Sequence, residues 1–305
     1  GGSTVKPRRP SIKPRISVEE LRQQYRRQAS QPQEEQIRLL DPLEKATRSR
    51  GMVRGDTGVV YEEKMVDHLC LWDDKHTECP QRFSSIITRC TELGLFARCQ
   101  RLPQRQVTNE ELLSLHCLAH INLLKMTSGE IDEDKLEKLA SAYDSIYFHP
   151  RTYELAKYAA GCTIDIVDSV VKGKIQNGMA IVRPPGHHAM EDEFCGYCYF
   201  NNVALAAKHA LDKLETKRIL IVDWDVHHGQ ATQRTFYNDP RVLYFSIHRY
   251  EHGLFWPELR ESEFDFVGVD KGRGFNFNVP LNQKGLGNAD YLAIFHQVLM
   301  PVAYE

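Results

Sequence analysis

Two short segments hold the side chains best suited to metal and acid–base chemistry. The first, Asp223–Gln230 (DWDVHHGQ), directly follows the apolar run RILIV. Because alternate side chains of a strand point to the same face, we expect Asp223, Asp225 and His227 to project together at a strand end. Mixed carboxylate and imidazole ligands suit a catalytic zinc with one open position. The alternative for this segment alone is a group of helix-capping Asp residues with incidental histidines.

The second segment is Arg183–His188 (RPPGHH), which follows the apolar run MAIV at 179–182. Two adjacent imidazoles after a rigid Pro-Pro-Gly turn suit paired acid–base work, since the pKa of histidine lies near neutrality and a neighbour can shift it. Surface or core histidines are the alternative for the pair taken alone. The two segments together, each at the end of a different predicted strand, favour a metal site.

The elements that must position these residues follow from the hydrophobic pattern. Apolar runs bounded by turn residues predict buried strands at 58–61, 179–182, 218–226, 241–248 and 275–279. Helical periodicity predicts helices at 109–126, 134–142, 152–172, 201–214 and 289–304. This alternation is typical of an α/β fold with a mostly parallel sheet and helices on both faces, in which functional groups follow the carboxyl ends of the strands.

Charge divides the 305-residue chain. Residues 1–56 hold 13 Lys and Arg and 7 acidic residues, a net charge of +6, so the other 249 residues carry 26 and 34, a net charge of −8. We interpret 1–56 as a basic, disordered tail, within which 17–40 can form a short charged helix. The KPRRP cluster is a solvated linker, a nuclear address or a patch for an acidic partner. No run is long enough for a membrane span, and neither membrane nor direct nucleic-acid binding is expected.

The cysteines are typical of a reducing compartment, because all 8 are scattered and form no dense framework. Cys195 and Cys198 make a single CxxC pair without a second one. We interpret them as structural thiols, with a redox or metal role as the alternative.

From Gly58 onward the chain closely resembles the zinc-dependent histone deacetylase family, class IIb. The matching motifs are Arg183–His188, Gly196–Asn202, Asp223–Gly229, Tyr244–Glu251 and Asn278–Pro280. Within the class, Tyr197, Trp72–Asp74 and Phe255–Pro257 point to the first deacetylase domain of the cytoplasmic tubulin deacetylase, with a polyamine deacetylase as the rival. The resemblance implies an arginase/deacetylase-like fold for 57–305.

Site roles are carried over from the resemblance onto matching residues. Asp225 and His227 would be two of three zinc ligands, His187 and His188 the general base and acid, and Asp223 the carboxylate that orients His187. The other implied positions are the tunnel residues Gly196, Tyr197 and Trp256, the rim residues Asp144 or Ser145, and a structural potassium site at Asp223, Asp225, His227, Ser246 and Ile247.

The sequence departs from the family pattern at two adjacent positions. Class I members have a carboxylate at the position of Gln230, whereas class IIb members have glutamine, as this chain does. His188 is therefore expected to be less cationic. Relatives usually have glycine where Ala231 stands, which would cost about 1 kcal/mol if the backbone there needs a positive φ. The third zinc ligand and the transition-state tyrosine have no counterpart in these 305 residues. We therefore expect 57–305 to be the N-terminal two-thirds of the domain and the chain alone to have little activity.

The resemblance implies zinc-dependent hydrolysis of the acetyl amide of N6-acetyl-lysine in tubulin- or histone-type proteins, in the cytoplasm or also in the nucleus. Two alternatives stay open. One is hydrolysis of acetylpolyamines, and the other is a non-catalytic truncated isoform that acts as a binding module.

Overall fold

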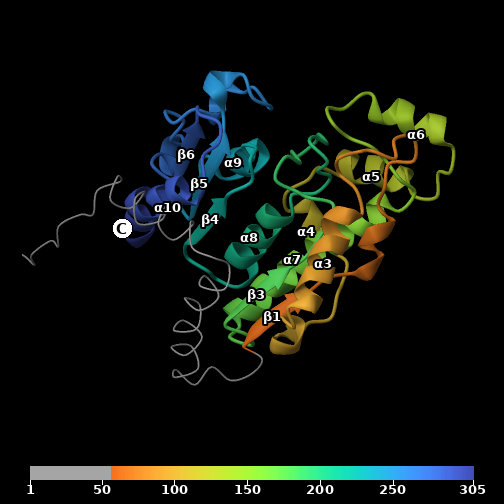
Figure 1. Ribbon diagram of the computed structural model, residues 1–305, viewed down its shortest axis with the longest axis horizontal. Coiled ribbons are helices and arrows are strands. Elements are labelled where there is room, and N and C mark those ends of the chain that lie inside the picture. Colours follow the sequence, from red (N-terminus) through yellow and green to blue (C-terminus); the bar gives the residue numbers. More distant parts are fainter. Residues whose placement is uncertain (1–55) are drawn as a thin grey trace, which may run out of the picture. The chain divides into compact units, whose positions relative to one another are not determined.

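A computed structural model describes residues 56–305 (Figure 1). Met52–Asn282 forms one compact unit, and Gln283–Glu305 belongs to a second. The helix expected at 17–40 and the predicted disordered tail lie outside the described residues, apart from Asp56. In the described part of the chain, no helix is long and apolar enough to cross a membrane.

Two three-stranded parallel sheets form the centre of the first unit. One has the order β2-β1-β3, built from Thr57–Val60 (β1), Gln100–Arg101 (β2) and Asn177–Ala180 (β3). The other has the order β4-β5-β6, built from Ile219–Asp223 (β4), Val242–Arg249 (β5) and Asn276–Leu281 (β6). The five predicted strands are therefore confirmed with shifted ends, and the two-residue β2 is too short to leave a pattern in the sequence.

Helices flank both sheets, as the α/β pattern predicted. Figure 1 shows α7 (Thr152–Val171) running alongside β1 and β3, against which it packs. Phe83 of α3 (Gln81–Glu92) packs with Val59 of β1, whereas α8 (Asn202–Lys213) and α9 (Gln230–Phe236) share a core with β4 and β5. The remaining α-helices of this unit are α4 (Asn109–Leu113), α5 (Leu118–Met126) and α6 (Glu133–Ala140).

Short 3-10 turns complete the first unit, and the described residues of the second unit, 283–305, are mainly helical. The turns are η1 (Glu63–Asp67), η2 (Phe96–Arg98), η3 (Glu251–Gly253), η4 (Arg260–Ser262) and η5 (Asp270–Gly272). The helix expected at 289–304 is confirmed in part, because α10 (Asn288–Ile294) and α11 (Met300–Tyr304) are joined by a π-helical segment, η6 (Phe295–Leu299).

The single helix expected at 109–126 is wrong, because α4 and α5 are separated by residues 114–117. The break has a packing reason. The side chain of His116 turns inward to bond the backbone of Met190 and Asn201, and the N–H of Cys117 donates to the carbonyl of Glu191 at 2.9 Å. In a continuous helix, the N–H of Cys117 would bond within the helix and could not reach the loop that follows His188.

Candidate active site

The turn that carries the two histidines is held by close backbone contacts. A Cβ on Gly186 would lie 2.6 Å from the backbone nitrogen of Asn202 and 2.7 Å from the carbonyl oxygen of Phe200, so this position requires glycine. The side-chain amide of Asn202 also donates to the carbonyl of Pro184 at 3.2 Å. The start of α8 therefore fixes the direction in which His187 and His188 leave the turn.

Asp223 orients His187, as the resemblance implied. Nδ1 of His187 lies 2.9 Å from Oδ2 of Asp223, which also accepts from the hydroxyl of Tyr244 at 3.0 Å. Burial alone would lower the pKa of His187, but the carboxylates of Asp223 and Asp225 raise it above its usual value. With Nδ1–H committed to Asp223, the other nitrogen, Nε2, faces Asp225 at 3.9 Å.

His188 has a different partner and the opposite electrostatics. Its Nδ1 donates to Oε1 of Gln230 at 2.6 Å, which leaves the lone pair on Nε2. Burial, and then the charge of His187, lowers the pKa of His188 well below its usual value. The rings of the two histidines lie only 3.9 Å apart between centroids. The surroundings therefore favour the protonated form of His187 and the neutral form of His188.

Asp225 and His227 meet at a distance that suits a shared metal ion. Oδ1 of Asp225 lies 3.2 Å from Nδ1 of His227 and accepts from the His227 backbone N–H at 2.8 Å. Two ligands about 2.0–2.1 Å from a tetrahedral zinc are separated by about 3.3 Å, so this carboxylate–imidazole edge fits zinc. Burial would raise the pKa of Asp225, but the hydrogen bond and charge of His227 and the charge of His187 lower it. The carboxylate is thus ionised.

These two residues do not by themselves enclose a metal ion. Among residues 56–305, no group of three or more His, Cys, Asp or Glu side chains is arranged to hold one. Asp225 and His227 thus provide one carboxylate–imidazole pair, and the zinc site stays a prediction.

The prediction that Asp223, Asp225 and His227 project together from one face of a continuing strand is wrong. Strand β4 ends at Asp223, and residues 224–229 bend away instead of continuing the expected strand to 226. Oδ1 of Asp223 accepts from the backbone N–H of Asp225 at 3.1 Å and so stabilises the bend. Asp223 consequently turns toward His187, whereas Asp225 faces His227.

The predicted tunnel residues lie beside the histidines. A Cβ on Gly196, whose φ is +54°, would lie 2.5 Å from Cδ2 of His188 and 2.7 Å from Cη2 of Trp256. The Trp256 ring meets the His188 ring edge-on at 4.7 Å between centroids. Tyr197 packs against His76, with 5.3 Å between centroids. Position 196 therefore requires glycine, because any side chain there would collide with His188 and Trp256.

Both predicted rim residues are in place, with different roles. Oδ2 of Asp144 accepts from the indole N–H of Trp256 at 2.8 Å, and Oδ1 accepts from the hydroxyl of Ser145 at 2.8 Å. The Asp144 and Ser145 carbonyls accept from the N–H groups of Gly196 (3.0 Å) and Tyr197 (2.9 Å). Asp144 and Ser145 are both exposed, and the rim role of either stays a prediction.

The residues assigned to potassium lie at the facing ends of two strands. Ser246 is paired with Asp223 across β4 and β5, and Ile247 follows it in the buried part of β5. The Ser246 hydroxyl donates to Nδ1 of His248 at 2.9 Å, because Nε2 of His248 donates to the carbonyl of Ser262. The lone pairs of the Ser246 oxygen remain available to a cation, and the potassium site stays a prediction.

Three functional contacts were missed by reasoning from sequence. Tyr244 supports Asp223, Phe255 stacks on His227 at 5.2 Å with an interplanar angle of 7°, and His228 bonds Gln233 at 2.9 Å and Ser262 at 2.8 Å. Tyr244 lies in an apolar strand, where the pattern predicts a core residue. Phe255 has no signal of its own beyond the Phe255–Pro257 resemblance. Nothing in the sequence distinguishes His228 from its neighbour His227.

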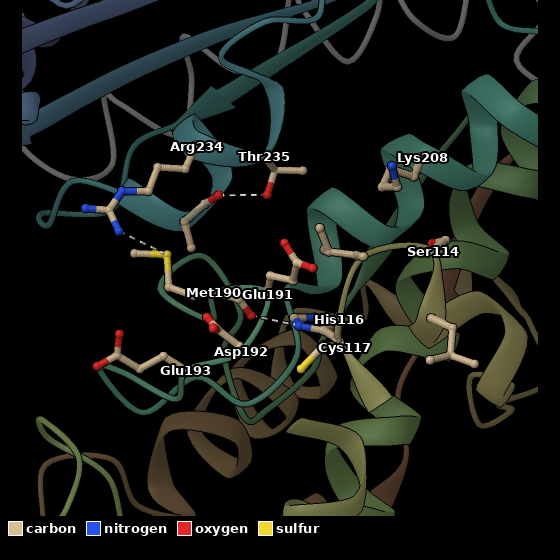
Figure 2. Close-up of a pocket in the computed structure, with 13 residues that line it drawn as sticks. Ser114, His116, Cys117, Met190, Glu191, Asp192, Glu193, Lys208, Arg234 and Thr235 are labelled. Carbon is tan, nitrogen blue, oxygen red and sulfur yellow. Dashed lines mark hydrogen bonds between the residues drawn. The ribbon is translucent and has the colours of Figure 1, made fainter. Parts of the chain in front are cut away.

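Behind the catalytic turn lies a separate pocket of about 580 Å³, which includes none of the predicted site residues (Figure 2). Figure 2 shows Met190 and Glu191 beside His116 and Cys117. Nδ1 of His116 donates to the Met190 carbonyl at 2.8 Å, and Nε2 accepts from the N–H of Asn201 at 3.0 Å. Burial lowers the pKa of His116 to about 3, so His116 is a neutral support beneath the loop that follows His188.

All eight cysteines are free. Burial raises the pKa of Cys195 to about 12 and raises that of Cys198 well above its usual value. Both are protonated at neutral pH, which fits the interpretation of structural thiols.

Comparisons with known proteins agree with this geometry. A family model described as the histone deacetylase domain matches residues 76–305. The chain is 49% identical over 251 residues to the polyamine deacetylase HDAC10 of Rattus norvegicus and to that of Homo sapiens, covering 82% of this chain and 42% and 37% of those proteins. It is 42% identical over 258 residues to histone deacetylase 18 of Arabidopsis thaliana, covering 84% of this chain and 38% of that protein. The chain thus spans about two fifths of these relatives' length.

A solved structure agrees as well. The crystal structure of the HDA15 HD domain superimposes with a TM-score of 0.74 at 34% identity, covering 82% of this chain and 68% of that one. The arginase/deacetylase-like fold with parallel sheets between helices is therefore confirmed. The comparisons do not single out the tubulin-deacetylating subgroup, and that assignment stays a prediction.

Proposed function

Because the chain belongs to the histone deacetylase domain family, we propose that it forms part of a zinc-dependent hydrolase that removes the acetyl group from an N-acetylated amine. One observation carries the proposal. The Asp225–His227 edge, 3.2 Å between Oδ1 and Nδ1, lies beside two adjacent imidazoles, of which His187 is hydrogen-bonded to a carboxylate and His188 to an amide. Such an arrangement can accept one proton and donate another at the same carbonyl.

The opposite directions of the two pKa shifts divide the work between the histidines. Nε2 of the neutral His188 accepts a proton from water as the water oxygen attacks the acetyl carbon. Nε2–H of His187 then donates to the amine nitrogen as the carbon–nitrogen bond breaks, giving acetate and a free amine. Zinc held by Asp225 and His227 would supply Lewis acidity to the carbonyl and the water. A third protein ligand and an oxyanion donor would come from residues outside 1–305.

The apolar walls decide what part of the substrate enters. Gly196 and Trp256 contact the ring of His188, and by the family resemblance these residues and Tyr197 would form the walls of the substrate tunnel. An uncharged acetylated alkylamine suits it, whereas a free ammonium would lose hydration with only partial cation–π compensation. The walls therefore favour an acetyl group on a straight aliphatic stem over the deacetylated product.

An acetylated polyamine is the substrate class that we place first. Relatives named polyamine deacetylases match at 49% identity, and the exposed carboxylate of Asp144 can attract the distal ammonium of such a substrate. The second candidate is N6-acetyl-lysine in a protein, including the tubulin- and histone-type substrates of the resemblance. For that substrate, Asp144 would instead accept a hydrogen bond from a backbone N–H beside the acetyl-lysine.

The test is a parallel assay of the full-length protein with acetylspermidine and an acetyl-lysine peptide, measuring acetate release together with zinc content. A higher kcat/KM for acetylspermidine supports the first substrate class, and a higher value for the peptide replaces it by the second. A stable, zinc-free protein that releases no acetate from either would instead support the binding-module alternative.

A further inference from the structure

A buried ion pair anchors the first residue of the histidine turn. Arg183 lies four residues before His187, and its side chain is 4% exposed. Nε and Nη2 of Arg183 donate to the two carboxylate oxygens of Glu78 at 3.2 and 2.9 Å. Glu78, which lies 105 positions earlier in the chain, is fully buried. The pair therefore joins the catalytic turn to a distant loop through a fork that only an arginine can make.

We propose that Arg183 is a positioning residue, whose bidentate pair with Glu78 holds His187 and His188 in register with the tunnel. The proposal rests on the hydrolase function proposed above. It assigns to the pair a role in positioning the histidines and not in stabilising the fold. Burying two charges costs solvation free energy, and replacing both by packed apolar side chains is often neutral for stability.

Two further donors of the guanidinium have partners outside Glu78. Nη1 donates to the carbonyl of Met65 at 2.5 Å, and Nη2 lies 3.3 Å from the hydroxyl of Tyr147. That hydroxyl donates in turn to the Glu78 carbonyl at 3.2 Å. The guanidinium is thus fixed in both direction and plane, which a flexible ammonium would not be.

The loop that receives Arg183 also shapes the tunnel wall. The backbone N–H of Glu78 donates to Nδ1 of His76 at 3.1 Å, and the His76 ring packs against Tyr197. Between Arg183 and the histidines, the bond from Asn202 to Pro184 and the close approach at Gly186 also fix the backbone. Two anchors thus precede the histidines, and the loop that holds the first also contacts the aromatic residue Tyr197.

The matched control is a second bidentate arginine pair in the same unit. Arg105 donates from Nη1 and Nη2 to Glu111 at 2.8 Å each, and from Nε to Asp165 at 2.6 Å. It ties α4 to α7 and touches neither the histidine turn nor the tunnel residues. Arg105→Lys should therefore disturb an ion pair without moving His187 or His188.

The experiment compares Arg183→Lys, the double variant Arg183→Met/Glu78→Met and Arg105→Lys in the full-length protein. Unfolding temperature, zinc content, kcat and KM are measured for each. Displacement of a catalytic group by about 1 Å costs about 100-fold in rate, so we expect kcat to fall about 100-fold in the first two variants, with KM within about threefold. The double variant should regain the unfolding temperature of the wild type but not its kcat, and Arg105→Lys should retain kcat.

A double variant with wild-type kcat would overturn the proposal, as would an equal loss in Arg105→Lys. If Arg183→Lys does not fold, Glu78→Asp carries the same expectation, because it keeps both charges and withdraws the carboxylate by one methylene. If the wild type releases no acetate, the proposed function fails separately. Crystal structures then decide the positioning role: Nε2 of His187 and His188 should shift in Arg183→Lys and not in Arg105→Lys, and unshifted imidazoles would overturn it.

Discussion

Nδ1 of His188 donates to the amide oxygen of Gln230 at 2.6 Å, whereas its neighbour His187 donates to the carboxylate of Asp223. A neutral acceptor does not stabilise a charged imidazole as a carboxylate does, and burial lowers the pKa of His188. The difference between an amide and a carboxylate therefore shifts the pKa values of two adjacent histidines in opposite directions, which supports the proposed roles of His188 as base and His187 as acid.

Replacing Gln230 by glutamate should shift the pH dependence of turnover. A carboxylate beside Nδ1 raises the pKa of His188, so a smaller fraction of His188 is neutral at pH 7. The acidic limb of the kcat/KM profile should move to higher pH, and kcat/KM at pH 6 should fall. An acidic limb that stays in place, or moves to lower pH, would argue against His188 as the base.

His188→Ala should remove turnover and keep the metal. Loss of a general base typically costs about 100- to 10,000-fold in rate. Asp225 and His227 are untouched, so zinc content should match the wild type. Rates of acetate release and elemental zinc are measured on the same preparation, with Cys79→Ser as a control outside the site. Turnover within tenfold of the wild type would remove His188 from the mechanism.

Asp144→Asn should separate the two substrate classes. An asparagine at the rim still accepts a hydrogen bond from a peptide N–H but no longer attracts an ammonium, an interaction of about 1 kcal/mol in water. We expect kcat/KM for acetylspermidine to fall about fivefold at low salt, and that for an acetyl-lysine peptide to change by less than twofold. Equal losses for both substrates would mean that the Asp144 charge does not select a cationic substrate.

The buried histidines should make the fold sensitive to acid. Burial lowers the pKa of His116 and His228 to about 3 and that of His248 to about 4, from an ordinary value of 6.5. Each folded pKa is depressed, so the unfolded chain binds more protons between these values. The contribution of each neutral histidine to the free energy of unfolding is complete above pH 6.5. It is lost as the pH falls toward 4, at up to about 1.4 kcal/mol per pH unit for each histidine.

His116→Gln isolates one of these contributions, because glutamine supplies a donor and an acceptor without a titrating group. Between pH 6 and 4.5, the free energy of unfolding of this variant should fall less steeply than that of the wild type, by about 1.4 kcal/mol per pH unit. Chemical denaturation across this range measures the slopes. Identical slopes would show that His116 is already protonated in the folded protein.

Much of the fold could be predicted from the sequence, because buried parallel strands are short apolar runs and long helices are periodic. The helices α3 and α9 were missed. Pro80 caps α3 without a side-chain hydrogen bond, and α9 has only seven residues. Ala231 lies within α9 and is absent from the residues with positive φ, so the expected strain does not arise.

The candidate site was predictable where residues are neighbours in the chain and not where the fold brings them together. His187, His188, Asp225 and His227 stand out by spacing alone. Glu78 is a single acid in a loop, and nothing in the sequence connects it to Arg183, 105 positions away. Asp225 lies in a bend after β4, stabilised by a hydrogen bond from its N–H to Asp223, which strand alternation does not anticipate.

The most direct test of the central claim is the zinc content and acetate release of Asp225→Asn beside the wild type, both as full-length protein. An amide is a poor zinc ligand compared with a carboxylate, and nearly the same size. We expect one zinc per wild-type chain, and acetate release that a chelator abolishes and added zinc restores. Asp225→Asn should lose both the zinc and the acetate release. A variant that keeps its zinc and its turnover would contradict the role of Asp225 as a zinc ligand.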